Sequence, residues 1–325
     1  QAIVSGNPIV AGKALDMGIV DKVVETDIVE SGLEFAEEII SKGSPTRKIR
    51  DLVDKIQADK GNTELFELAA TGLDKTHRGQ FAPQQILKCI EAAVNAADFD
   101  AGMAVERQCF SECLSHPQRE ALIHIFFAER AANKIPGLSK EVPLIDVQKA
   151  SIIGAGTMGG GIAMCFANAG IAVLIHDNDP DGLQRGLKVI AGNYARTVAK
   201  GRLSQQEMDS RMALIQPAAS MDELGDADVV IEAVYENLDL KKEIFSKLDT
   251  IMKPGALLAT NTSGLDVDAI AASTSRPEFV CGMHFFSPAN VMKLLEVVKG
   301  EKSSPAALGT AMALGKRLGK VSVMA

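Results

Sequence analysis

Three glycines at fixed spacing are the first residues whose types could support chemistry. Gly154, Gly156 and Gly159 form a G-x-G-x-x-G turn between an apolar run, 150–153, and a helical pattern, 158–168. The first glycine permits a tight turn, the second lets backbone amides approach a pyrophosphate, and the third lets helix and strand pack closely. The helix start adds unpaired N–H groups and a partial positive charge. The pattern predicts a dinucleotide site, with a glycine-rich turn that only packs as the alternative.

An acidic residue lies at the position that a dinucleotide site requires. Asp177 ends the next apolar run, 172–177, at about the 20-residue separation that the motif requires. Its carboxylate can accept hydrogen bonds from ribose hydroxyls and would repel a 2′-phosphate. Asn178 and Asp179 follow it and supply no arginine. We therefore expect NAD rather than NADP, and we assign the preceding His176 to packing rather than chemistry.

A histidine and a glutamate form the second candidate pair. His284 lies in an apolar strand pattern, 279–286, and Glu296 lies inside the next one, 293–298. A carboxylate within an apolar strand is costly unless it is paired. If the two strands are neighbours, Glu296 faces His284 and fixes its ring orientation, as a general base requires. A purely structural His–Glu pair is the alternative.

The elements that must position these residues alternate from Lys149 onward. Short β patterns and helical patterns follow one another, which indicates βαβ units and a parallel sheet. The predicted fold class is α/β, a Rossmann-type doubly wound sheet with later strands appended. The predicted strands are 150–153, 172–177, 214–216, 228–233, 256–260, 279–286, 293–298 and 320–324, with helices at 158–168, 181–200, 205–213, 240–252 and 306–318.

Residues 1–145 are predicted to be mostly helical. Asn7 and Pro8 suit the N-cap and first position of a helix that runs to Gly18, and a strand is predicted at 19–24. Several helices around one short strand make a poor self-contained core, so this half is predicted to be a piece of something larger. Further helices are predicted at 28–41, 47–56, 63–71, 83–97, 103–115 and 120–133, with a linker at 134–143.

Composition limits the class of protein. The chain has 325 residues, of which 46% are hydrophobic, and a net charge of -8. It offers no basic footprint for nucleic acid and no apolar run long enough to span a bilayer. The five cysteines include no C-x-x-C pair, which predicts free, buried thiols in a reducing compartment and no metal site. The chain begins at Gln1 without Met, so we expect this residue not to be the natural N-terminus.

Several motifs follow one another in the second half. They are Gly-Ala-Gly-Thr-Met-Gly at 154–159, Glu-Ala-Val-Tyr-Glu-Asn at 232–237, Asn-Thr-Ser at 261–263, and the stretch from His284 to Glu296. Together they resemble the L-3-hydroxyacyl-CoA dehydrogenase family over residues 147–325. The sequence His-Phe-Phe-Ser-Pro at 284–288 resembles that of peroxisomal-type bifunctional members, although Ser287 occupies a position where many relatives have Asn.

The first half carries a second resemblance. Residues 7–21 resemble the end of an enoyl-CoA hydratase (crotonase) domain, and 99–103 and 126–130 resemble the helices that join it to the dehydrogenase. By this resemblance, 1–145 is the C-terminal part of a crotonase domain plus linker, and 146–325 is an NAD-binding domain. The crotonase catalytic acids and the family's C-terminal helical domain are not in this sequence, so we expect no hydratase activity and only the cofactor half of the dehydrogenase site.

The resemblance also implies roles for single residues. His284 would be the base, Glu296 would orient it, and Ser263 would hydrogen-bond the substrate oxygen beside the nicotinamide. The alternatives are an N-cap role for Ser263 in a helix starting near Asp266, and a solvated helix start for Glu236 and Lys241. The implied cofactor contacts are Gly154, Gly156, Thr157, Met158, Gly159, Asp177, Val234, Glu236, Lys241, Asn261, Ser263 and Ser287.

The implied activity is NAD-dependent oxidation of a (3S)-3-hydroxyacyl-CoA to the 3-oxoacyl-CoA in fatty acid β-oxidation, as part of a bifunctional hydratase/dehydrogenase. One alternative is another Rossmann β-hydroxyacid dehydrogenase, which a lysine base would favour. The other is a non-catalytic NAD-binding scaffold, and the presence of His284, Glu296 and Ser263 argues against it. The expected partner is an acyl-CoA substrate, with homo-oligomerisation left open. Bacterial cytoplasm and peroxisome both fit.

Overall fold

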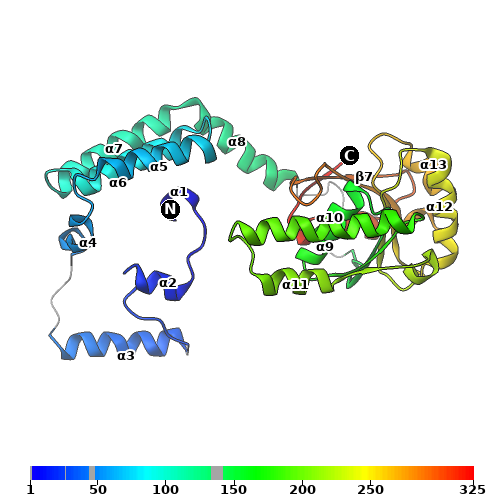
Figure 1. Ribbon diagram of the computed structural model, residues 1–325, viewed down its shortest axis with the longest axis horizontal. Coiled ribbons are helices and arrows are strands. Elements are labelled where there is room, and N and C mark those ends of the chain that lie inside the picture. Colours follow the sequence, from blue (N-terminus) through cyan, green and yellow to red (C-terminus); the bar gives the residue numbers. More distant parts are fainter. Residues whose placement is uncertain (1, 26, 44–47, 133–141) are drawn as a thin grey trace. The chain divides into compact units, whose positions relative to one another are not determined.

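A computed structural model describes residues 2–25, 27–43, 48–132 and 142–325 (Figure 1). The chain divides into two compact units, Gln1–Ile125 and Phe126–Ala325. The division falls inside helix α8 (Pro117–Ala132). Most of the predicted linker at 134–143 lies outside the described residues.

The second unit is built on one eight-stranded sheet. Its order is β3-β2-β1-β4-β5-β6-β7-β8, and neighbouring strands are parallel except for the antiparallel pair β6–β7. The predicted α/β doubly wound fold is confirmed, and every strand predicted from Lys149 onward is present with its ends within one residue. The strands are β1 (Lys149–Ile153), β2 (Ala172–His176), β3 (Ile215–Pro217), β4 (Val229–Glu232), β5 (Leu257–Thr260), β6 (Val280–Phe285), β7 (Leu294–Val298) and β8 (Val321–Met324).

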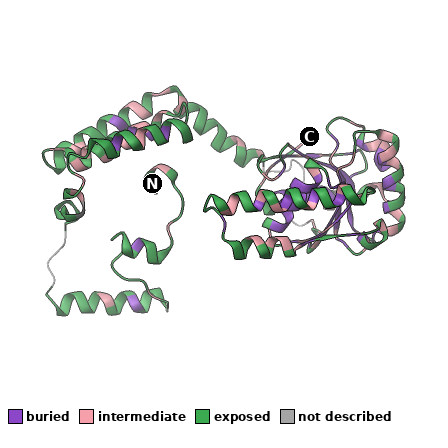
Figure 2. Cartoon of the chain, viewed as in Figure 1, coloured by how far each residue is buried: buried purple, intermediate pink, exposed green. Residues whose placement is uncertain are grey.

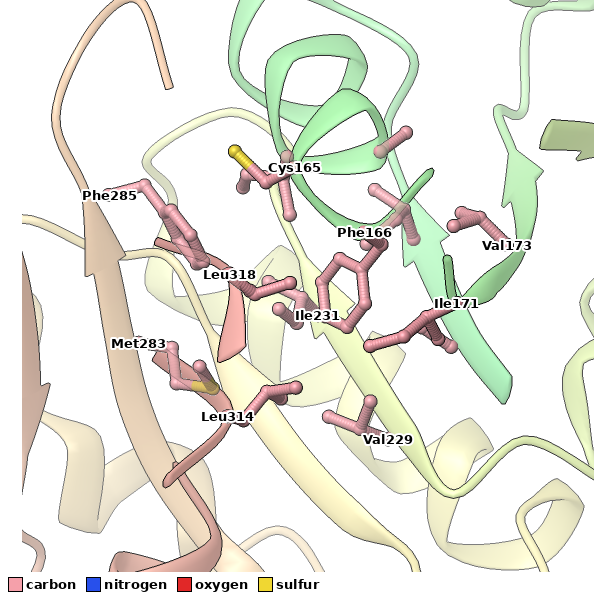
Figure 3. Close-up of a cluster of buried hydrophobic side chains, with 14 of the residues drawn as sticks. Cys165, Phe166, Ile171, Val173, Val229, Ile231, Met283, Phe285, Leu314 and Leu318 are labelled. Atoms are coloured by element: carbon pink, nitrogen blue, oxygen red, sulfur yellow. The ribbon is translucent and has the colours of Figure 1, made fainter. Parts of the chain in front are cut away.

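Helices cover both faces of this sheet. All four residues of β4 and all four of β5 are buried, because strands in a parallel sheet are enclosed on both sides. Figure 3 shows one of the two cores, in which Phe166 of a helix lies among Ile171, Val229 and Ile231. One face carries α9 (Thr157–Asn168), α10 (Pro180–Ala199), α11 (Gln205–Ala213) and α14 (Pro305–Arg317), and the other carries α12 (Leu238–Ile251) and α13 (Val267–Ala271).

The sheet order determines where a ligand can bind. The chain runs outward from β1 to β2 and β3, then returns to build β4 and β5 on the other side. Open α/β sheets bind ligands at the carboxyl ends of the strands beside such a reversal. The glycine turn follows β1 directly, so it lies at this crevice.

The first unit consists of helices over its described residues. They are α1 (Ala2–Ser5), α2 (Ala11–Asp16), α3 (Ile28–Ser41), α4 (Asp54–Gln57), α5 (Thr63–Thr76), α6 (Phe81–Asn95), α7 (Phe99–Ser115) and the first part of α8, with a 3-10 turn at Ile49–Asp51. Most of their surface is exposed (Figure 2). The buried hydrophobic side chains among the described residues of this unit are Ala14, Phe66, Leu73 and Cys109, which matches the expectation of a poor core.

Three predictions for this unit are wrong in detail. Residues 19–24 form no strand, because a single strand has no neighbour with which to pair. The first helix begins at Ala11 rather than at Pro8, with Val10 as its N-cap. The described part of 47–56 is not one helix, since Leu52 leaves the helical region at ψ 78° and separates the 3-10 turn from α4.

The five cysteines are free. Cys109, Cys165 and Cys281 are buried, whereas Cys89 and Cys113 are partly exposed, so the expectation of burial is confirmed for three of them. Burial raises the pKa of Cys281 to about 12, which keeps this thiol protonated and unreactive.

Candidate active site and cofactor site

The glycine turn has the geometry that its spacing predicts. Gly154 has a φ of +98°, and a Cβ there would stand 2.7 Å from the Ala233 carbonyl oxygen. A Cβ on Gly159 would lie only 1.8 Å from the Gly154 carbonyl oxygen, so α9 can approach β1 only without one. At Gly156 an added Cβ would meet nothing within 4 Å. The first and third glycines thus allow the close packing, and the second leaves open space at the crevice.

The N-terminus of α9 faces this open space. Gly156 is the N-cap and provides no side-chain hydrogen bond to the helix. The first N–H groups of a helix have no acceptor within it, so those of Thr157 and Met158 are available to an anion. Thr157 is exposed, and Met158 is half-buried against the core. These residues fit the pyrophosphate of a dinucleotide.

Asp177, just after the end of β2, accepts a hydrogen bond from the same turn. One carboxylate oxygen accepts a hydrogen bond from the Ala155 N–H at 2.8 Å, and the other accepts one from the Asp179 N–H at 2.9 Å. An ionised carboxylate has further lone pairs, so it can still accept from ribose hydroxyls. His176 is buried, and its ring is hydrogen-bonded to the Ala218 carbonyl and to Asn178, which agrees with a packing role.

A cleft of about 530 Å³ lies beside Asp177. Its lining includes Met221, Lys247 and Thr250, which sequence reasoning missed. Met221 follows β3, and the other two lie in the second half of α12. No spacing in the sequence links these positions to the glycine motif, and only the packing of α12 and of the segment after β3 brings them to the cleft.

His284 and Glu296 meet across β6 and β7. They are directly opposite in the antiparallel register, and His284 Nδ1 donates to Glu296 Oε2 at 2.8 Å. The His284 side chain is 17% exposed, and the ring of Phe286 packs against it with centroids 4.7 Å apart. With Nδ1 engaged by the carboxylate, Nε2 is the nitrogen that can accept a proton. The pair has the arrangement of an oriented general base.

Ser263 and Glu236 meet on the loops that follow β5 and β4. One oxygen of Glu236 accepts from the Ser263 N–H at 2.9 Å, the Ser263 hydroxyl at 3.2 Å and the Thr262 hydroxyl at 2.6 Å. The N-cap of α13 is Asp266, so Ser263 does not cap that helix. Partial burial acts to raise the pKa of Glu236, but these hydrogen bonds and the charge of Lys241 outweigh it and lower the pKa to about 2.

Lys241 is not at a solvated helix start. Its side chain is 1% exposed, and its Nζ lies 2.7 Å from Glu232 Oε1 and 3.4 Å from Glu236 Oε2. Glu232 was missed by sequence reasoning, although it ends an apolar strand as a carboxylate that needs a partner. Val234 is another implied cofactor contact, and its N–H donates a hydrogen bond to Glu232. It therefore belongs to the same hydrogen-bond network.

The remaining implied cofactor contacts lie at the same edge of the sheet. Asn261 follows β5, and its Oδ1 accepts a hydrogen bond from the Phe285 N–H at 2.8 Å, which ties β5 to β6. Ser287 is exposed just beyond the end of β6. Among the described residues, no group of three or more His, Cys, Asp or Glu could hold a metal ion, and no helix is long and apolar enough to cross a membrane.

Comparison with known families identifies this arrangement. The model of the 3-hydroxyacyl-CoA dehydrogenase NAD-binding domain matches residues 149–325. The chain belongs to the 3-hydroxyacyl-CoA dehydrogenase family. Residues 149–325 are therefore an NAD-binding domain, and the predicted cofactor is confirmed at the level of this family.

Relatives extend the similarity beyond that domain. The chain is 39% identical to the peroxisomal bifunctional enzyme of Cavia porcellus over 99% of its own length and 44% of the relative. It is 33% identical to the peroxisomal fatty acid β-oxidation multifunctional protein of Oryza sativa, over 97% of the chain and again 44% of the relative. The chain thus spans less than half the length of these relatives.

Solved structures of other 3-hydroxyacyl-CoA dehydrogenase family members share the fold. The (S)-3-hydroxybutyryl-CoA dehydrogenase of Ralstonia eutropha is 37% identical, with a TM-score of 0.54, over 55% of this chain and 63% of that one. The dehydrogenase part of multifunctional enzyme 1 from C. elegans is 31% identical, with a TM-score of 0.55, over 61% of this chain and 47% of that one.

The cofactor preference of this family member can be tested at Asp177. Asp177→Asn keeps an acceptor for the Ala155 N–H but removes the charge that would repel a 2′-phosphate. We expect the ratio of NADH to NADPH affinity to fall about tenfold, an amount that corresponds to about 1.4 kcal/mol. Fluorescence titration with each cofactor measures the ratio, and an unchanged ratio would show that another feature selects NAD.

Proposed function

We propose that this chain takes part in the NAD-dependent oxidation of a (3S)-3-hydroxyacyl-CoA to the 3-oxoacyl-CoA, and that it supplies the cofactor half of the site with the base. The observation that carries the proposal is the His284–Glu296 pair, with 2.8 Å between Nδ1 and Oε2. His284 lies near the carboxyl end of β6, which runs parallel to β5. It is therefore at the same edge of the sheet as the glycine turn and Ser263.

Three residues of the chain have separate roles in the proton transfer. His284 Nε2 takes the proton from the 3-hydroxyl, while Glu296 holds the ring and balances the charge that the imidazole gains. Ser263, whose hydroxyl donates to Glu236 in the structure, would turn to donate to the substrate oxygen and so fix the position of C3. When bound, NAD⁺ supplies the acceptor for the hydride from C3. The buried faces of the sheet hold these groups in place, which lowers the cost of orienting them.

We place this activity in a bifunctional β-oxidation enzyme. Similarity to the bifunctional relatives covers 99% of the chain, so it includes the helices of residues 1–145 as well as the NAD-binding domain. We assign 1–145 to the end of a crotonase domain plus its linker, and hydratase activity to the longer protein. The relatives favour a peroxisomal setting over bacterial cytoplasm.

Acetoacetyl-CoA reduction tests the proposal in the reverse direction. The chain should oxidise NADH in the presence of acetoacetyl-CoA, and NADPH should be a poor replacement. Turnover of free acetoacetate but not of its CoA thioester would favour another β-hydroxyacid dehydrogenase. NADH binding without turnover of either compound would mean that residues 1–325 hold only the cofactor half of the site, as expected from the sequence.

A further inference from the structure

Glu232 is a fully buried carboxylate at the carboxyl end of β4. Its Oε1 accepts from Lys241 Nζ at 2.7 Å and from the Val234 N–H at 2.8 Å, and its Oε2 accepts from the Thr260 hydroxyl at 2.7 Å. In register it lies beside Ile153 of β1 and Thr260 of β5. The carboxylate therefore lies at the crevice edge of the sheet without reaching solvent.

Lys241 joins this carboxylate to one that borders the crevice. Its Nζ is 3.4 Å from Glu236 Oε2, while the other Glu236 oxygen accepts from Ser263. Exposure rises along this path, from 0% at Glu232 and 1% at Lys241 to 42% at Glu236. One continuous set of contacts thus runs from the buried strand to the exposed turn that carries Ser263.

The energetics of buried charges indicate a role for the contacts that join Glu232, Lys241 and Glu236. Replacing a buried ion pair with well-packed apolar residues is often neutral or stabilising, whereas removing one partner is strongly destabilising. A gain in stability therefore does not by itself explain why these two positions are charged. What they supply is a fixed place for the Lys241 ammonium. Without Glu232, its nearest carboxylate would be Glu236, which would be drawn away from Ser263.

We propose that Glu232 is a positioning residue for the nicotinamide end of the cofactor site, acting through Lys241 and Glu236 on the turn that carries Ser263. The inference rests on the proposed function, which puts Ser263 at the substrate oxygen, and on the family resemblance, which makes Glu236 a cofactor contact. It changes the role of Lys241 from a direct cofactor contact to a buried link.

Two variants of the 325-residue chain test this by NADH fluorescence titration. Glu232→Gln keeps the shape and an acceptor oxygen but leaves Lys241 without its 2.7 Å counter-charge, and we expect the Kd for NADH to rise about tenfold. Glu232→Gln combined with Lys241→Met removes both charges. We expect this double variant to bind NADH more tightly than Glu232→Gln, since no ammonium remains to draw Glu236 away from Ser263.

The control is Asp228→Asn at the other end of β4. Asp228 also pairs with a lysine, Lys253, and accepts the N–H groups of Gln148 and Lys149. It precedes the strand, away from the crevice, so the Kd for NADH should stay within about twofold of that of the unmodified chain.

Three results would overturn the proposal. A lower thermal stability of Glu232→Gln with an unchanged Kd would mean a purely structural role. A double variant that binds no tighter than Glu232→Gln would mean that Lys241 contacts the cofactor itself. If Glu232→Gln does not fold, the double variant is compared with the unmodified chain, and a Kd more than about tenfold higher would overturn the proposal. Because the readout is binding, the presence or absence of turnover in the unmodified chain bears on the proposed function and not on this proposal.

Discussion

Replacing His284 with Ala is expected to lower kcat for acetoacetyl-CoA reduction by about 10²–10⁴-fold, the usual contribution of a positioned acid or base. In this direction His284 delivers the proton that it would remove during oxidation. The substitution leaves the glycine turn and Asp177 untouched, so the Kd for NADH should stay within about twofold. Steady-state rates and fluorescence titration measure the two quantities separately.

His124→Ala is the matched control for this prediction. His124 is exposed on α8, and we assign it no role, so its replacement should leave kcat unchanged. Turnover of His284→Ala at the rate of the unmodified chain would show that the base is another residue. A large loss of NADH affinity in the same variant would instead assign His284 to cofactor binding.

Replacing Gly159 with Ala is expected to abolish measurable NADH binding. The new Cβ would lie 1.8 Å from the Gly154 carbonyl oxygen, a backbone atom that cannot move aside alone. Helix α9 would have to shift away from β1, and its N-terminal amides would move from the pyrophosphate position. Forced overpacking of this kind costs about 1–3 kcal/mol or more of unfolding free energy, which chemical denaturation measures beside the binding titration.

Gly192→Ala separates this effect from the general effect of alanine in a helix. Gly192 lies in α10, where nothing is within 4 Å of an added Cβ. Alanine is a better helix former than glycine by about 0.5–1 kcal/mol, so this variant should be as stable as the unmodified chain or more so, with unchanged NADH affinity. Normal NADH binding by Gly159→Ala would contradict the role given to the turn.

Elements of the second unit could be predicted because their signals are local. Strands such as β1 and β4 are short apolar runs that the sheet buries on both faces, so their composition reveals them directly. In the first unit the same method placed a strand at 19–24, where the structure has none. The start of α7 was placed four residues too late, although Asp98 accepts from the Ala101 N–H as its N-cap.

The sequence by itself determined the strands of the sheet, the cofactor turn, and the pairing of His284 with Glu296 on the condition that their strands are neighbours. Each depends on residues that are near one another in the chain or on adjacent strands, so spacing alone constrains their geometry. Only the tertiary structure decided the environment of Lys241 and Glu236. Glu236 reaches Ser263 across 27 positions, and Lys241 is on a helix whose polar start looks solvated. Its burial against Glu232 follows from the packing of α12 on the sheet, because contacts between distant segments are set by how whole elements pack.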